Sequence, residues 1–114
     1  MIEGFDEHSL VIVNLVNPKE KFFGLLRALS AAGVTMRAVN LDSFEDWMHQ
    51  IARGEERDIE LITMFVPLFR VERIFLDEAA GAVQSYSQRF ESVVGRTVAS
   101  YLGLPSDAGD GRSV

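Results

Sequence analysis

Imidazole and thiol groups are scarce in this sequence of 114 residues, which contains two histidines and no cysteine. The lack of cysteine excludes disulfide bonds, thiolate nucleophiles and cysteine-ligated zinc or iron–sulfur centres. His49 follows Glu45 by four residues, so on a helix the two side chains share a face and could contact one ion. Two ligands do not complete a metal site, and His8 stands in an acidic segment. We therefore predict no catalytic residue, no metal site and no cofactor.

Other motifs with known chemistry are incomplete or missing. Residues 107–111, with the sequence DAGDG, resemble a calcium loop but lack its alternating oxygen ligands and its closing glutamate. The sequence has no phosphate-binding glycine loop, no serine nucleophile elbow and no paired-histidine motif. These observations favour a protein that is not an enzyme.

The charges argue against a nucleic-acid partner. Seventeen acidic and eleven basic residues give a net charge of -6, which repels phosphate backbones unless arginines cluster on one surface. The densest basic group comprises Arg70, Arg73, Arg89 and Arg96, and acidic residues are interleaved with it. Ion pairs explain this pattern best. The alternative is that an oligomer brings Arg37, Arg70 and Arg73 together as an RNA-binding surface.

The composition predicts one globular domain, with 47% hydrophobic and 25% charged residues. Charged residues interrupt every apolar run before it reaches the roughly 18 residues that a membrane helix needs. The first eight residues carry three acidic side chains rather than a basic region before an apolar one. We therefore expect no secretory signal, no membrane partner and a cytoplasmic location.

Five short apolar segments, rich in β-branched and aromatic residues, predict strands at residues 10–16, 22–29, 34–41, 59–68 and 71–76. The first run is apolar at nearly every position, which predicts a strand covered on both faces. Gly24 lies within the second segment, where a missing side chain indicates a strong bend or a close approach of another backbone. The first three strands are joined by connections too short for a helix, so we expect antiparallel pairing.

Two segments have the periodicity of amphipathic helices. Residues 44–53 place Phe44, Trp47, Met48 and Ile51 on one face, and Ser43 is predicted to cap this helix. A second helix begins after Ser85, with Gln88 in a capping-box position, and continues to Leu102. We predict an acidic leader at residues 1–9, a single domain at 10–103 and a disordered tail at 104–114.

The order of these segments resembles an Sm-like barrel, a member of the SH3-like small barrels. The resemblance rests on VIVNLVNPKEKFFGLLRALSAAGVTMRAV, with its mid-strand glycine, and on FVPLFRVERIFLDE, with its proline-containing junction. It implies a mainly β fold, a strongly bent antiparallel barrel of five strands, here with a helix inserted between strands three and four and a C-terminal helix. The turns at residues 30–33 and 67–70 lack the polar base-reading residues of RNA-binding Sm proteins. The chain also resembles a bacterial family with which we associate no activity.

The apolar residues exceed what one small barrel can bury, so we expect a homo-oligomer. The predicted outward-facing set is Val11, Val13, Leu15, Ile62 and Met64. Sm-like barrels form rings by pairing the fourth strand with the fifth strand of a neighbour, and the resemblance implies the same here. The sequence thus favours a non-catalytic, homo-oligomeric interaction or scaffold module. The alternatives are an RNA-binding Sm-like protein and a small-ligand-binding barrel with a pocket around Trp47 and Phe69.

Overall fold

The structure is a computed structural model that describes residues 3–56 and 59–104. The chain divides into two compact units, the first ending at Asp77 and the second beginning at Glu78. The first unit contains β1 (Leu10–Leu15), β2 (Glu20–Leu29), β3 (Gly33–Asn40), the 3-10 turn η1 (Leu41–Ser43), α1 (Phe44–Ala52), β4 (Ile62–Pro67), the 3-10 turn η2 (Leu68–Arg70) and β5 (Val71–Leu76). The second contains α2 (Tyr86–Val94) and α3 (Val98–Leu102). The single domain predicted for residues 10–103 stays a prediction.

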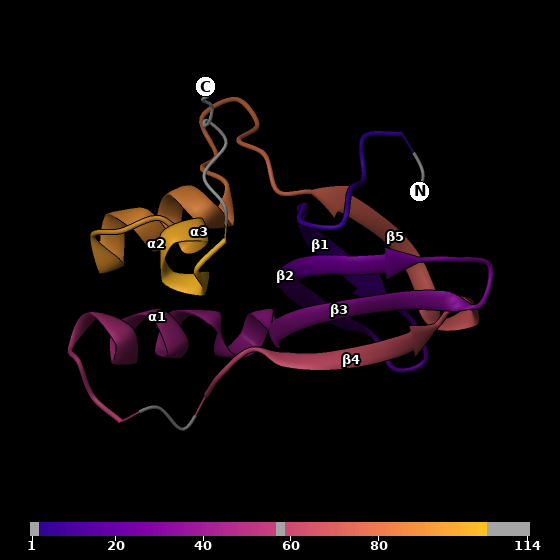
Figure 1. Cartoon of the computed structure of the whole chain (residues 1–114), viewed down its shortest axis with the longest axis horizontal. Helices are drawn as coiled ribbons and strands as arrows, with labels where there is room; N and C mark the ends of the chain where they lie inside the picture. Colours follow the sequence, from indigo (N-terminus) through magenta and orange to yellow (C-terminus); the bar gives the residue numbers. More distant parts are fainter. Residues whose placement is uncertain (1–2, 57–58, 105–114) are drawn as a thin grey trace. The chain divides into compact units, whose positions relative to one another are not determined.

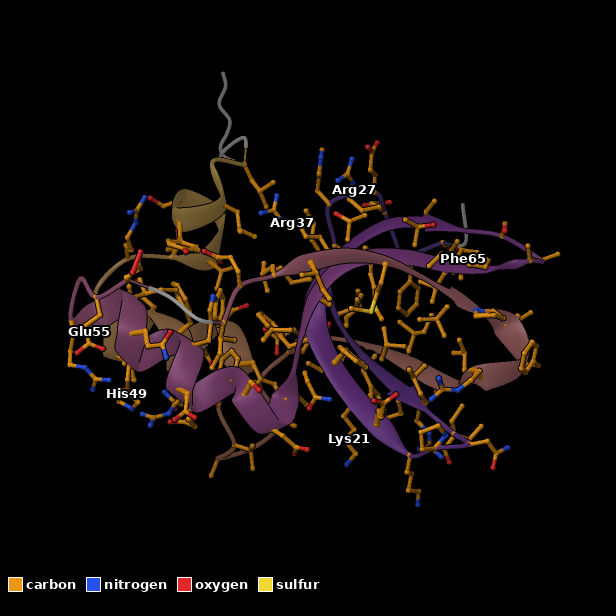
Figure 2. All side chains as sticks on the ribbon, turned by 90° about the horizontal axis from the view of Figure 1, so that it is seen from below. Lys21, Arg27, Arg37, His49, Glu55 and Phe65 are labelled. Carbon is orange, nitrogen blue, oxygen red and sulfur yellow. The ribbon has the colours of Figure 1, made fainter. Side chains whose placement is uncertain are left out.

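The five strands form one antiparallel sheet in the order β4-β3-β2-β1-β5 (Figure 1). The prediction of a mainly β, antiparallel fold with a helix between the third and fourth strands is confirmed. The prediction of a closed barrel is wrong, because in the described chain β4 pairs only with β3 and β5 only with β1. The sheet is curved, and side chains fill the space on its concave side (Figure 2).

The inner face of the sheet carries the main core of the first unit. Residues directly opposite one another in paired strands share a face, and Val11 pairs with Gly24 as Gly24 pairs with Ala38. The buried members of this core are Val11, Val13, Leu15, Leu26, Val34, Met36, Ala38 and Val66. The prediction that Val11, Val13 and Leu15 point outward is therefore wrong, since all three are at most 2% exposed.

The outer face of the sheet is also apolar around its centre. Ile12 and Phe23, which pair with each other across β1 and β2, are both buried, so the prediction that β1 is covered on both faces is confirmed there. The ring of Phe23 lies 5.3 Å from that of Phe44 in an edge-to-face arrangement. The Phe44 ring in turn lies 5.9 Å from Trp47. These contacts attach α1 to the outer face through the apolar positions that the sequence pattern predicts.

The start of α1 differs in detail from the prediction. Ser43 makes no capping hydrogen bond through its side chain. Instead, Oδ1 of Asn40 accepts a hydrogen bond of 2.8 Å from the backbone N–H of Asp42, which caps the preceding turn η1. Ser43 is still the residue that precedes α1, but the prediction that its side chain caps the helix is wrong, and the capping side chain of this segment belongs to η1.

The second unit contains two short helices where one long helix was predicted. The capping box between Ser85 and Gln88 is present as predicted, with hydrogen bonds of 3.0 and 2.9 Å. Gly95, at φ 87°, ends α2 in the left-handed conformation that glycine tolerates best. Thr97 then caps α3. The rings of Phe90 and Tyr101 lie 5.7 Å apart and hold the two helices together.

None of the helices in the described residues has the length and apolar character that a membrane crossing needs. The predicted disordered tail, beyond Leu104, and the calcium-loop-like residues 107–111 lie outside the described residues.

At Gly24, β2 and β3 lie so close together that no side chain fits between them. A Cβ atom at this position would lie 2.5 Å from Cα and 2.6 Å from Cβ of Ala38, and it would overlap the carbonyl oxygen of Arg37. Two of these three atoms belong to the backbone, so relief would require the strands to separate. The close approach that the sequence predicted at this glycine is confirmed.

We expect Gly24→Ala to reduce the free energy of unfolding by about 3 kcal/mol, because it overpacks a strand pair that cannot yield. Urea or thermal unfolding measures this loss. Gly54→Ala is the matched control, since it has no atom within 4 Å and only a left-handed φ of 67° to strain, at a cost of about 1 kcal/mol. Equal losses for the two variants would contradict the close-approach account.

Candidate functional site

The two edge strands carry the most conspicuous exposed apolar surface. On β4, Ile62 is 59% and Phe65 54% exposed, while Phe75 on β5 is 44% exposed. In the turn between these strands, Phe69 is the most exposed large apolar residue of the described chain, at 82%. Because edge strands also present unpaired backbone groups, apolar side chains there make the edges candidates for association with another chain.

The predicted interface residues therefore divide into two groups. Ile62 lies exposed on the β4 edge, and Met64 is half-buried on the same strand against the inner core. The β1 residues of the set belong to the core, as described above. The sequence analysis did not assign Phe65 and Phe75 to the interface, although both lie within predicted strands. Phe65 is labelled in Figure 2.

Arg70 has a structural role in the first unit. Its Nε donates to the carbonyl oxygen of Val16 at 2.8 Å, and its Nη2 donates to the carbonyl oxygen of Pro18 at 2.8 Å. The same Nη2 lies 3.0 Å from Oε1 of Glu20. The planar guanidinium thus holds the β1–β2 turn against η2, a geometry that its forked donors suit.

The other two arginines of the RNA-binding alternative lie on separated strands. Arg37 is exposed on β3, and Arg73 is on β5, with β2 and β1 between them. Arg73 lies 3.8 Å from Glu72 and 5.7 Å from the centre of the Phe75 ring. Within one chain, therefore, Arg37, Arg70 and Arg73 do not come together as a basic surface.

His49 and Glu45 are neighbours on α1, as their spacing predicts, with Nε2 and Oε1 3.7 Å apart. Both side chains are about half exposed, and His49 is visible on α1 in Figure 2. Within residues 3–56 and 59–104, no group of three or more histidine and carboxylate side chains is placed to hold a metal ion. His8 is exposed in the segment before β1.

A groove of about 450 Å³ lies in the first unit, where β3 turns into η1 beside the start of β4. Its lining is Phe22, Ala38, Val39, Asn40, Ser43, Ile59, Glu60 and Ile62. Trp47 is fully buried and does not line it, but Nε1 of Trp47 donates to Oε1 of Glu60 at 3.3 Å. Glu60 was missed by the sequence analysis, which placed residues 59–61 inside the fourth strand.

The small-ligand-binding alternative needs Trp47 and Phe69 side by side, and the structure does not place them together. Trp47 follows the end of β3 that pairs with the start of β4, whereas Phe69 follows the end of β4 (Figure 1). The six residues of β4 separate these two ends by roughly 20 Å, at about 3.3 Å per residue. The groove therefore contains neighbours of Trp47 but not Phe69.

A second hollow, of about 400 Å³, lies on the second unit and is lined by Gln84, Gln88, Glu91 and Ser92. Three of these side chains form local hydrogen bonds. Gln88 closes the capping box, and the Ser92 hydroxyl donates to the Gln88 carbonyl oxygen at 3.1 Å and accepts from Gln84 at 3.5 Å. These polar groups stabilise α2, so the first-unit groove is the better candidate for a ligand.

Comparisons of the chain with protein-family models, with curated proteins and with solved structures find no match.

We expect Trp47→Ala to lower the free energy of unfolding by about 3 to 5 kcal/mol, because Trp47 is fully buried against Phe44. Thermal unfolding measures this effect. Phe69→Ala is the matched control and should leave the midpoint nearly unchanged, since Phe69 is mostly exposed. A wild-type midpoint for Trp47→Ala would refute the packing role of this residue.

We expect no binding to single-stranded RNA at physiological salt, because the chain is acidic and its arginines are dispersed or paired. A gel-shift assay with oligo-U and oligo-A tests this expectation. Micromolar retention that weakens steeply with added salt would show that an assembly gathers these arginines into a positive surface.

Proposed function

We propose that this chain is a non-catalytic, homo-oligomeric interaction or scaffold module of Sm-like type. The observation that carries the proposal is the apolar, unpaired edge of β4, on which Ile62 and Phe65 are more than half exposed. A soluble chain covers or charges such an edge unless another chain pairs with it. The β4 strand has no charged residue in its sequence ITMFVP.

The other edge of the sheet offers a complementary strand. β5 has the same length as β4, six residues, and no strand of the described residues pairs with its outward edge. Phe75 pairs with Ile12 and so lies on the outer face, and Phe65 pairs with Thr35 on that same face. If β4 of one copy joins β5 of another in a continuous sheet, these two half-exposed aromatic rings meet on one side of the junction.

The strand order supports the Sm-like part of the proposal. In the resemblance described above, the fourth and fifth strands are the ones that join neighbouring subunits, and here these strands are the two edges of the sheet. A contact between two different edges is heterologous. A row of copies therefore ends in one free β4 edge and one free β5 edge until it closes into a ring. The expected assembly is therefore cyclic rather than a two-fold dimer.

Light scattering at micromolar concentration tests the assembly, and we expect a mass several times 12.7 kDa. Phe65→Lys should reduce this mass, because it places a charge in the proposed aromatic contact. Val83→Lys is the matched control, since Val83 is 69% exposed in the second unit, outside both edge strands. A monomeric wild-type chain, or equal effects of the two variants, would overturn the proposal.

A further inference from the structure

The groove beside η1 has the size and the walls of a small-molecule site. Its volume of about 450 Å³ lies in the usual range for ligand pockets, about 300 to 1,000 Å³. Its apolar walls come from three segments of the first unit, namely Phe22 on β2, Val39 on β3, and Ile59 and Ile62 around the start of β4. Apolar walls with a few fixed polar groups are the arrangement that binds and orients a small ligand.

Two polar lining residues belong to the turn that leads into α1. Asn40 precedes η1 and Ser43 ends it, and both are half-buried. Oδ1 of Asn40 accepts the 2.8 Å hydrogen bond from the backbone N–H of Asp42, which identifies the oxygen of this amide and places Nδ2 on its other side. Neither Nδ2 of Asn40 nor the hydroxyl of Ser43 donates to a residue that the structure describes. The described part of the chain thus gives the groove two donors without an acceptor.

Glu60, the third polar lining residue, has a role in the fold and is assigned no contact with a ligand. Its Oε1 accepts a hydrogen bond of 3.3 Å from Nε1 of the buried Trp47. None of the lining residues that the structure describes is a lysine or an arginine. A carboxylate or phosphate group on a ligand would therefore lose its hydration without a lining cation to replace it.

A carbonyl oxygen fits these donors best. It carries two lone pairs, so one oxygen can accept from both Asn40 and Ser43. Because an uncharged carbonyl costs much less to transfer from water than a carboxylate, two neutral hydrogen bonds are enough to compensate it. The rest of such a molecule must be apolar, since Phe22, Ile59 and Ile62 offer no polar side-chain group.

We propose that this groove binds a small uncharged molecule in which a carbonyl oxygen is joined to an aromatic or branched apolar body. Nδ2 of Asn40 and the hydroxyl of Ser43 donate to the oxygen, and the apolar body lies against Phe22 and the two isoleucines. All of these residues belong to one copy of the chain, so the site does not rest on the proposed assembly.

Trp47 provides the readout, because it is the only tryptophan of the chain and its indole bonds to the lining residue Glu60. The probe is phenylacetamide. Phenylacetate is the comparator of the same shape with a charged carboxylate, and phenethylamine is the comparator without a carbonyl. We expect phenylacetamide to change the Trp47 emission saturably, and we expect both comparators to bind at least tenfold more weakly.

Two variants test the donors. Asn40→Asp keeps the oxygen that caps η1 and replaces the Nδ2 donor by an acceptor, so it should weaken phenylacetamide more than tenfold with an unchanged unfolding midpoint. Asn17→Asp is the matched control, since it makes the same change at an exposed position of the β1–β2 turn, outside the groove. Ser43→Ala should weaken binding about fivefold, the loss of one neutral hydrogen bond.

The titration is repeated in Phe65→Lys, because Ile62 also lies on the β4 edge and an assembly could cover it. Phe65 does not line the groove, so this variant should bind phenylacetamide at least as tightly as the wild type. Binding without assembly, or assembly without binding, distinguishes the failure of one proposal from the failure of the other.

The proposal is overturned if phenylacetamide at about 5 mM, a concentration that detects millimolar affinity, gives no saturable change in the Trp47 emission of the wild type and of Phe65→Lys. It is also overturned if either comparator binds as tightly, or if Asn17→Asp weakens binding as much as Asn40→Asp. Backbone amide NMR gives an independent check. Shifts at Asn40 and Ser43 support the groove, and shifts confined to other residues refute it.

Discussion

The close contact of β2 with β3 at Gly24 is the constraint on which the first unit depends. Because Gly24 has no side chain, the carbonyl of Arg37 and the backbone of Ala38 can approach β2 directly. On the inner face, Val11 and Ala38 lie beside this position and belong to the core cluster. On the outer face, the neighbouring Phe23 packs against Phe44 of α1. The tight pairing at Gly24 thus lies between two buried apolar faces of the same strand pair.

The parts of the fold that depend on local sequence patterns could be predicted from the sequence, and the parts that depend on pairing between segments could not. Strand positions followed from local runs of β-branched residues, and the close approach at Gly24 followed from its place within such a run. The orientation of β1 did not follow, because a run that is apolar at nearly every position gives no alternation. Since a shift of one residue reverses the faces, only the pairing of Val11 with Gly24 assigns Val11 to the core. The break at Gly95 was hidden because Phe90 and Tyr101 keep the helical period across it.

The candidate sites were harder to predict, because they depend on contacts between distant segments. Arg70 reaches the β1–β2 turn across more than fifty residues of sequence, so its place in a basic run gave no sign of a structural role. Glu60 is thirteen residues from Trp47, and no periodic pattern links a loop carboxylate to a helix indole. The edge aromatics Phe65 and Phe75 were present in the predicted strands, but their exposure depends on the strand order, which places β4 and β5 at the two edges of the described sheet.

Ile62 belongs to two features of the first unit, because it lines the groove beside η1 and is also an exposed residue of the β4 edge. A strand of a second copy on this edge would cover Ile62 and with it part of the groove. The proposed assembly would therefore change the access to the groove through a single side chain, at the first residue of β4, with no need for a conformational change elsewhere in the sheet.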